Sequence, residues 1–233
     1  MPKLKILLSD LKIEIEHKYD YMQQFCDDYV SRFEIADIVA ATDEIAVSKE
    51  KQSVPTAPIE VCESLCIYRT IAEQLPNHNR FVFHGAAIEH DGKAFLFTAP
   101  SGTGKTTHIN LWRKHLGNKV SMINGDKPII KVEETPIVYG TPWAGKEGYQ
   151  RNTNAPIKAI CILKQGKTNH IKKLETTDAL KHIMRQVYMP HNPIALSKTL
   201  ELIGKILETT PVYELSCDIS EEAFKTSYNE MTK

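Results

Sequence analysis

The pattern of hydrophobic and polar positions predicts alternating strands and helices in the first third of the chain. Apolar and charged residues alternate over residues 3–18 and again over Ile35–Ser48, as they do in strands with one buried face. Apolar residues recur at helical spacing over Tyr21–Phe33 and, on one clear stripe, over Ile59–Leu75. We therefore expect residues 1–80 to form an α/β extension of a larger sheet or a small lobe of their own.

Residues 81–233 predict a larger core, which either continues the same domain or forms a second one. Two apolar stretches, Phe81–Ile88 and Lys93–Thr98, flank the turn EHDG and indicate a β-hairpin. The other expected strands are Val120–Ile123, a hairpin within Lys127–Val138, Ala159–Leu163, His170–Leu174 and Val212–Leu215, and the expected helices are Thr107–Leu116, Asp178–Met189, Ile194–Leu207 and Glu221–Met231. Because hairpins alternate with strand–helix units, the sheet should be mixed.

Composition narrows the class of protein. The 233 residues are 42% hydrophobic and 25% charged, with 29 basic and 29 acidic side chains, so the basic excess typical of nucleic-acid binders is missing. Five cysteines at irregular spacing do not form a disulfide framework and predict buried, reduced thiols. With no signal-peptide pattern and no apolar run of membrane-spanning length, we expect a cytoplasmic protein that binds neither nucleic acid nor membrane.

The stretch APSGTGKTT has the residues of a phosphate-binding loop, placed between a predicted strand and a predicted helix. Ser101, Gly102, Thr103 and Gly104 let the backbone curl so that its N–H groups face phosphate oxygens. The helix that starts near Thr107 adds its positive N-terminal end. In this pattern the cation is Lys105, and the hydroxyl that binds Mg²⁺ is that of Thr106.

Two positions near this loop need a separate interpretation. Ala99 stands where the common pattern has glycine, and alanine fails there only if φ must be positive. Asp126 follows the predicted strand Val120–Ile123, where phosphate-binding sites place an acid that holds Mg²⁺. The alternative for Asp126 is a plain turn residue in Asn124-Gly125-Asp126.

Together these motifs, a His84-Gly85 pair, APSGTGKTT and a strand ending in Gly125-Asp126, resemble the catalytic domain of HPr kinase/phosphorylase. They are also similar to the core of ATP-dependent phosphoenolpyruvate carboxykinase. The resemblance is clear over about residues 81–130. It implies a P-loop-containing α/β core with a mixed sheet flanked by helices, ATP bound by Ser101–Thr107, and Mg²⁺ near Thr106 and Asp126.

The chain departs from that family beside the acid. In HPr kinase an aspartate pair follows the strand, and one member is taken as the base that activates the acceptor serine. Here Asp126 is followed by Lys127, so one carboxylate serves the metal, the base or both. His84 matches the family's histidine and either assists proton transfer or binds a phosphate, unless it is only a structural histidine within a strand.

A glycine-rich stretch, TPWAGKEGYQRNT, is the other candidate for substrate contact. Long irregular loops in compact domains tend to carry function. Lys146 and Arg151 carry charges that suit a phosphate or an acidic acceptor, Trp143 offers a surface for stacking, and Glu147 lies in the same loop. The alternative is an ordinary loop with a core tryptophan.

The function predicted from these residues is a Mg²⁺-dependent kinase. It would transfer the γ-phosphoryl group of ATP to a hydroxyl, with a serine of a peptide or protein as the acceptor that the resemblance implies. A small-molecule hydroxyl is the alternative acceptor. A nucleotide-binding regulator without transfer activity is the alternative function, which Lys127 in place of the second aspartate favours.

Overall fold

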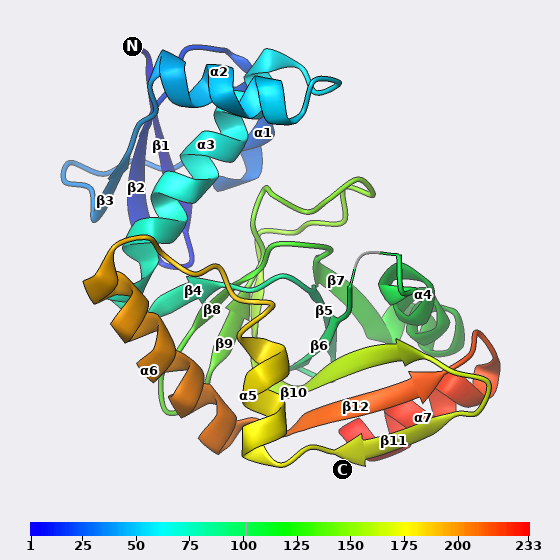
Figure 1. The fold of residues 1–233 in the computed structure, drawn as a ribbon. Coiled ribbons are helices and arrows are strands. Elements are labelled where there is room, and N and C mark those ends of the chain that lie inside the picture. The colour runs from blue at the N-terminus through cyan, green and yellow to red at the C-terminus, as the bar shows by residue number, and fades with distance from the viewer. Residues whose placement is uncertain (101) are drawn as a thin grey trace.

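A computed structural model describes residues 1–100 and 102–233, and it confirms an α/β fold with a mixed sheet flanked by helices (Figure 1). The strands form two sheets, one of three strands and one of nine. The three-stranded sheet, drawn in blue at the N-terminal end of the molecule, is covered by the helices of the same segment (Figure 1). The division into domains at residue 80 stays a prediction.

The N-terminal segment folds around the sheet β1-β2-β3. Its elements are β1 (Lys3–Leu8), β2 (Leu11–Glu16), α1 (Tyr21–Phe25), a 3₁₀ turn (Asp27–Tyr29), β3 (Ile38–Ala40), α2 (Glu44–Ser53), α3 (Ile59–Gln74) and a second 3₁₀ turn (Leu75–His78). β1 and β2 are antiparallel, and β3 joins β2 in parallel. The strands over residues 3–18 and the helix predicted to start at Ile59 are confirmed.

Two predictions in this segment are wrong in part. The helix expected over Tyr21–Phe33 ends at Phe25, because the chain turns back to the first sheet, where Val30 forms an antiparallel bridge with Ile6. The strand expected over Ile35–Ser48 ends at Ala40, and α2 starts soon after. The signal for α2 was Asp43, whose carboxylate accepts a hydrogen bond from the Ala46 N–H at 2.7 Å and so caps the helix.

The rest of the chain forms the larger sheet and the helices that flank it. The strand order in this sheet is β4-β8-β9-β10-β6-β5-β7, with β12 beside β10 and β11 beside β12. Its elements are β4 (Arg80–Val82), β5 (Ala86–His90), β6 (Lys93–Thr98), α4 (Lys105–Leu116), a 3₁₀ turn (Gly117–Lys119), β7 (Val120–Asn124), β8 (Ile129–Lys131), β9 (Ile137–Tyr139), β10 (Asn154–Gln165), β11 (His170–Lys173), α5 (Thr176–Ile183), α6 (Pro193–Thr209), β12 (Val212–Cys217) and α7 (Glu221–Met231). β10 runs parallel to β6 and β12 and antiparallel to β9, so the sheet is mixed as predicted.

Two segments of the core also differ from the prediction. The single strand expected over Phe81–Ile88 is two strands, of which β4 pairs with β8 and β5 with β6 and β7. The chain bends at Gly85, where a side chain would lie only 2.6 Å from the Phe83 ring. The helix expected over Asp178–Met189 ends at Ile183, because Val187 returns to the sheet and bridges to Phe83.

The two faces of β10 show how the core is divided. Ile160 and Ile162 pack in the cluster that includes α5 and α6, whereas Ala159, Cys161 and Leu163 pack in the cluster that includes α4 and α7. This follows from the two-residue period of a strand. Figure 1 shows α5 and α6 on one side of the sheet and α4 and α7 on the other.

The N-terminal segment is joined to the larger sheet through a shared apolar cluster. Val82, Ile129 and Trp143 pack with the buried residues of β1, β2 and α3. As predicted, the five cysteines are free, and all but Cys217 are buried. Among the described residues, no helix has both the length and the apolar character needed to cross a membrane.

Gly140 and Gly204 allow a test of the packing. A Cβ on Gly140 would lie 1.9 Å from the Arg151 carbonyl oxygen, so Gly140→Ala should lower the free energy of unfolding by about 1–3 kcal/mol or more. Gly204 lies in α6 with open space around it, so Gly204→Ala should raise the same quantity by about 1 kcal/mol. Urea denaturation of both variants measures these changes. A neutral Gly140→Ala would contradict the close backbone crossing.

Candidate nucleotide site

A glycine loop connects β6 to α4 at the carboxyl end of the strand. Gly102 and Gly104 have positive φ values of 79° and 106°, which only glycine adopts readily. Gly104 at the N-cap has no side chain that could cap the helix, so among the described residues no N-cap side chain competes with an anion for the N–H groups of the first turn. Ala99 is buried, and it is not among the residues with positive φ, which explains why alanine is tolerated there. Ser101, predicted to bind nucleotide, lies outside the described residues.

Asp126 lies among three basic side chains next to this loop. Its Oδ1 is 3.2 Å from His84 Nε2 and 4.0 Å from Lys105 Nζ, and its Oδ2 is 3.8 Å from Lys127 Nζ. The fold thus brings together the three residues predicted to be catalytic, His84, Lys105 and Asp126. They come from the β4–β5 bend, the start of α4 and the end of β7.

Burial and charge act in opposite directions on this cluster. Burial would raise the pKa of Asp126, but the hydrogen bond from His84 and the charges of Lys127, His84 and Lys105 together lower it. Burial lowers the pKa of Lys105 and of Lys127, while the Asp126 carboxylate opposes both shifts. The Asp126 carboxylate is therefore held ionised. Its negative charge offsets the cost of burying the two lysine ammonium groups.

Asn124 fixes the backbone of Asp126. Its buried side-chain oxygen accepts hydrogen bonds from the N–H groups of Asp126 and Lys127, both at 2.8 Å, and its amide donates to the Thr141 carbonyl at 2.9 Å. The Gly85 N–H donates to the Asp126 carbonyl at 3.0 Å. The turn predicted at Asn124-Gly125-Asp126 is thus present, but its side-chain acceptor is Asn124, which leaves the Asp126 carboxylate to the cluster.

Glu147 brings a second carboxylate to the glycine loop. The Thr106 hydroxyl donates to Glu147 Oε1 at 3.4 Å. The loop that carries Glu147 lies against Asp126, since a Cβ on Gly145 would be 3.1 Å from Asp126 Cβ. The Thr106 hydroxyl and the Glu147 carboxylate thus meet at the first turn of α4, and Asp126 lies 4.0 Å from Lys105, the first residue of that helix.

The other residues predicted for substrate contact lie in two environments. Trp143 is 6% exposed, and its ring centroid lies 5.8 Å from that of Phe25 and 5.4 Å from that of Tyr68. The side chains of Lys146 and Arg151 are on the surface, and the Arg151 N–H donates to the Ile123 carbonyl. Both alternatives for Trp143 are compatible with this placement, because it is packed with the core and also lines a cavity beside Asp126.

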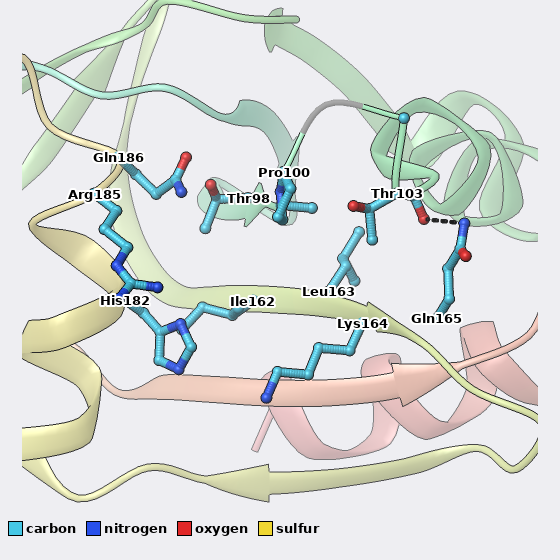
Figure 2. Close-up of a pocket in the computed structure, with 12 residues that line it drawn as sticks. Thr98, Pro100, Thr103, Ile162, Leu163, Lys164, Gln165, His182, Arg185 and Gln186 are labelled. Atoms are coloured by element: carbon cyan, nitrogen blue, oxygen red, sulfur yellow. Dashed lines mark hydrogen bonds between the residues drawn. The ribbon is translucent and has the colours of Figure 1, made fainter.

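A cavity of about 500 Å³ lies on one side of the glycine loop, and Figure 2 draws the side chains that line it. Its lining residues are Thr98, Ala99, Pro100, Gly102, Thr103, Ile162, Leu163, Lys164, Gln165, His182, Arg185 and Gln186. Gln165 donates to the Thr103 carbonyl at 3.4 Å, and this bond links β10 to the loop (Figure 2). Sequence reasoning missed the residues from β10 and from the end of α5, because no motif connects them to the loop.

Charge distinguishes this cavity from a second one of about 360 Å³ that also adjoins the loop. The first contains Lys164, His182 and Arg185 and no carboxylate among its described lining residues. Lys164 is paired with Glu214 at 2.6 Å, whereas Arg185 makes no salt bridge within the described part of the chain. The second cavity is lined by Asp218 without a lysine or arginine among its described residues, so an anionic ligand fits the first better.

Comparison with known proteins gives structural likenesses to solved structures and none to a sequence family. No family model matches the chain, and no curated protein matches it. The chain is similar to the solved structure of the Hpr(Ser) kinase/phosphatase from Coxiella burnetii, with a TM-score of 0.37 and 10% sequence identity, over 65% of this chain and 96% of that one. A likeness this low does not establish function, so the motif resemblance stays a prediction.

The pKa of Asp126 should depend on His84. Asp126 stabilises the fold at neutral pH, and this contribution is lost as the pH falls below the unfolded-state pKa and through the lowered folded-state pKa. In His84→Ala the folded-state pKa should rise, so the contribution becomes smaller and its loss is complete at a higher pH. Carboxyl ¹³C NMR titration measures this, with Asp178, which pairs with Lys181, as the internal control. An unchanged Asp126 titration would contradict the contact.

Proposed function

We propose that the protein is a Mg²⁺-dependent kinase that transfers the γ-phosphoryl group of ATP to a hydroxyl, with a serine of a peptide or protein as the acceptor. The observation that carries the proposal is the placement of Lys105 Nζ 4.0 Å from Asp126 Oδ1, at the N-terminus of α4 and behind the glycine loop. Phosphoryl transfer depends mainly on positioning and on neutralising charge, and this arrangement supplies both.

The nucleotide is proposed to lie along the loop with its phosphates at the start of α4. The backbone N–H groups of the loop and the Lys105 ammonium group hold the phosphate oxygens. The nucleoside occupies the cavity of about 500 Å³, which has apolar walls at Ile162 and Leu163 and the cation of Arg185 (Figure 2).

The donor atoms near the loop suit Mg²⁺. In the described part of the chain no group of three or more His, Cys, Asp and Glu side chains is arranged to hold a metal ion. A nucleotide-bound Mg²⁺ needs only one or two protein carboxylates, because phosphate and water supply the other ligands. Thr106, Asp126 and Glu147 would hold the ion. When bound, it neutralises charge that develops on the phosphate oxygens.

Asp126, oriented by His84, is proposed to orient the acceptor and accept its proton. The acceptor oxygen forms a bond to the γ-phosphorus as the bond from that phosphorus to the β–γ bridging oxygen breaks, which leaves ADP. Asp126 Oδ1 accepts the hydrogen bond of the acceptor hydroxyl. His84 Nε2, 3.2 Å from the same oxygen, is the nitrogen that donates to Asp126, so it orients the carboxylate while the acceptor's proton passes to Asp126.

A nucleotide-binding regulator remains the second candidate function, and Lys127 favours it. Its ammonium group stands beside Asp126 where the related kinases have a second carboxylate, and the pKa of Asp126 is lowered, which makes this carboxylate a weak base. The kinase and the regulator are distinguished by whether the protein shows any phosphoryl transfer that depends on Lys105.

Lys105→Ala should abolish transfer and weaken ATP binding by roughly 10–100-fold, because a charged partner of the phosphates is removed. The measurement is a screen with Mg²⁺ and γ-labelled ATP against pooled serine peptides and pooled small alcohols, alongside calorimetric ATP titration. Lys114→Ala, an exposed lysine on the same helix, is the matched control and should behave as wild type. Unchanged ATP affinity in Lys105→Ala would overturn the proposed site. Tight ATP binding without any transfer would favour the regulator.

Asp126→Asn should reduce turnover by roughly 10²–10⁴-fold while changing ATP affinity much less, because its carboxylate acts on the acceptor. Steady-state kinetics with the acceptor found in the screen, and ATP titration of the same variant, measure the two effects. Asp178→Asn is the control, since this exposed carboxylate lies on α5 and pairs with Lys181. Full activity in Asp126→Asn would discard the assigned role.

A further inference from the structure

We propose that the cavity between α3 and the loop Pro142–Gln150 is the acceptor site, and that it selects a hydroxyl attached next to an apolar group. This inference rests on the proposed function. The cavity measures about 320 Å³, and its lining residues are Tyr21, Phe25, Val61, Ser64, Leu65, Tyr68, Asp126, Lys127, Pro142, Trp143, Ala144, Gly145, Gly148 and Gln150. We name it the aromatic cavity.

Asp126 connects the aromatic cavity to the phosphate site. It is a lining residue of the aromatic cavity, and the same side chain lies 4.0 Å from Lys105, the cation assigned to the phosphates. Reacting atoms must approach to about 3–3.5 Å before transfer. The two cavities that flank the glycine loop contain neither Asp126 nor Lys105 among their described lining residues. A molecule in the aromatic cavity is therefore better placed to present a hydroxyl to Asp126.

The wall of the aromatic cavity determines the class of acceptor. Tyr21 stacks on Phe25 at 5.2 Å between ring centroids, and Trp143 contacts both Phe25 and Tyr68. Aromatic and aliphatic surface of this kind binds apolar groups. The charged side chains in the described lining are Asp126 and Lys127, which lie 3.8 Å apart and compensate each other. A neutral, apolar body with a hydroxyl at its Asp126 end fits this environment.

Trp143 also carries a buried polar atom close to the aromatic cavity. Its side chain is buried, and its indole N–H has no hydrogen-bond partner within the part of the chain that the structure describes. Buried polar atoms in native proteins are nearly always satisfied by protein, water or a bound molecule. The indole nitrogen is itself almost fully buried, so an oxygen of a molecule in the cavity reaches it only if neighbouring side chains move.

The N-terminal segment is therefore assigned a role in choosing the acceptor. α1 and α3 supply Tyr21, Phe25, Leu65 and Tyr68 to the wall, whereas the larger sheet supplies Asp126. The shared apolar cluster that contains Trp143 and Val82 fixes the two parts against each other.

Binding is tested first, without any need for transfer. The probes are two blocked dipeptides, acetyl-Ser-Leu-amide and acetyl-Ser-Asn-amide, and two alcohols, 2-phenylethanol and glycerol. Tryptophan fluorescence reports binding, because Trp143 lines the cavity whereas Trp112 is fully buried in another cluster. We expect a saturable change with the apolar member of at least one pair, at a Kd about tenfold or more below that of its polar partner. Trp143→Phe should lose the signal.

Leu65→Arg tests the wall itself. Leu65 is a half-buried residue of α3. Its replacement by arginine should raise the Kd of the apolar probe about tenfold or more and leave the affinity for ATP unchanged. Leu200→Arg, at an exposed position of α6, is the matched control and should change neither. Transfer kinetics of the same variants should show a raised acceptor KM in Leu65→Arg.

The outcomes separate the two proposals. Tighter binding of the dipeptide identifies a peptide as the source of the hydroxyl, and tighter binding of 2-phenylethanol identifies a small molecule; either supports the aromatic cavity. Three outcomes overturn the assignment of the aromatic cavity as the acceptor site. They are no saturable binding of any probe, equal affinity for both members of each pair, and wild-type binding by the Leu65→Arg variant. Apolar binding at the cavity without Lys105-dependent transfer would reject the kinase and retain the binding site. Transfer insensitive to Leu65→Arg would retain the kinase and reject the site.

Discussion

Compensation of charge in a partly buried space is the constraint on which the site depends. Lys105 and Lys127 are both buried enough to lower their pKa, and the Asp126 carboxylate opposes that effect. One misplaced side chain would leave an uncompensated charge, which costs far more in the interior than at the surface. The hydrogen bonds from the backbone of Asp126 to Asn124, and from Asn124 to Thr141, explain how a short turn holds the carboxylate where both lysines reach it.

Close backbone approach is the second requirement, and glycine meets it. The two ends of the loop after β9 approach each other so closely that a Cβ on Gly140 would overlap the Arg151 carbonyl, and the same Cβ would lie 2.7 Å from the Ile123 carbonyl of β7. The same loop lies against Asp126 at Gly145, which has a positive φ of 79°. These approaches place Glu147 at Thr106 and Trp143 at the aromatic rings of the N-terminal segment.

The features that could be predicted from the sequence are those that depend on residues close together in the chain. The glycine loop, the helix after it and the hairpin before it follow from short-range patterns, and Asp126 follows from its place after a strand. The α2 helix was missed because it buries only Val47 and so has almost no periodicity, although Asp43 marked its start. The residues around Arg185 were missed because they reach the loop only through the order of strands in the sheet, which no local pattern encodes.

The apolar cluster shared by Val82, Ile129, Trp143 and the first three strands has a consequence for shortening the chain. The glycine loop and Asp126 lie wholly after residue 80, which invites a minimal fragment that begins at Phe81. Such a fragment would turn Val82, Ile129 and Trp143 from core into surface, and contiguous apolar surface of this kind promotes aggregation. The first 80 residues therefore cover apolar surface of the larger sheet and its loops, and a fragment without them would need a redesigned surface.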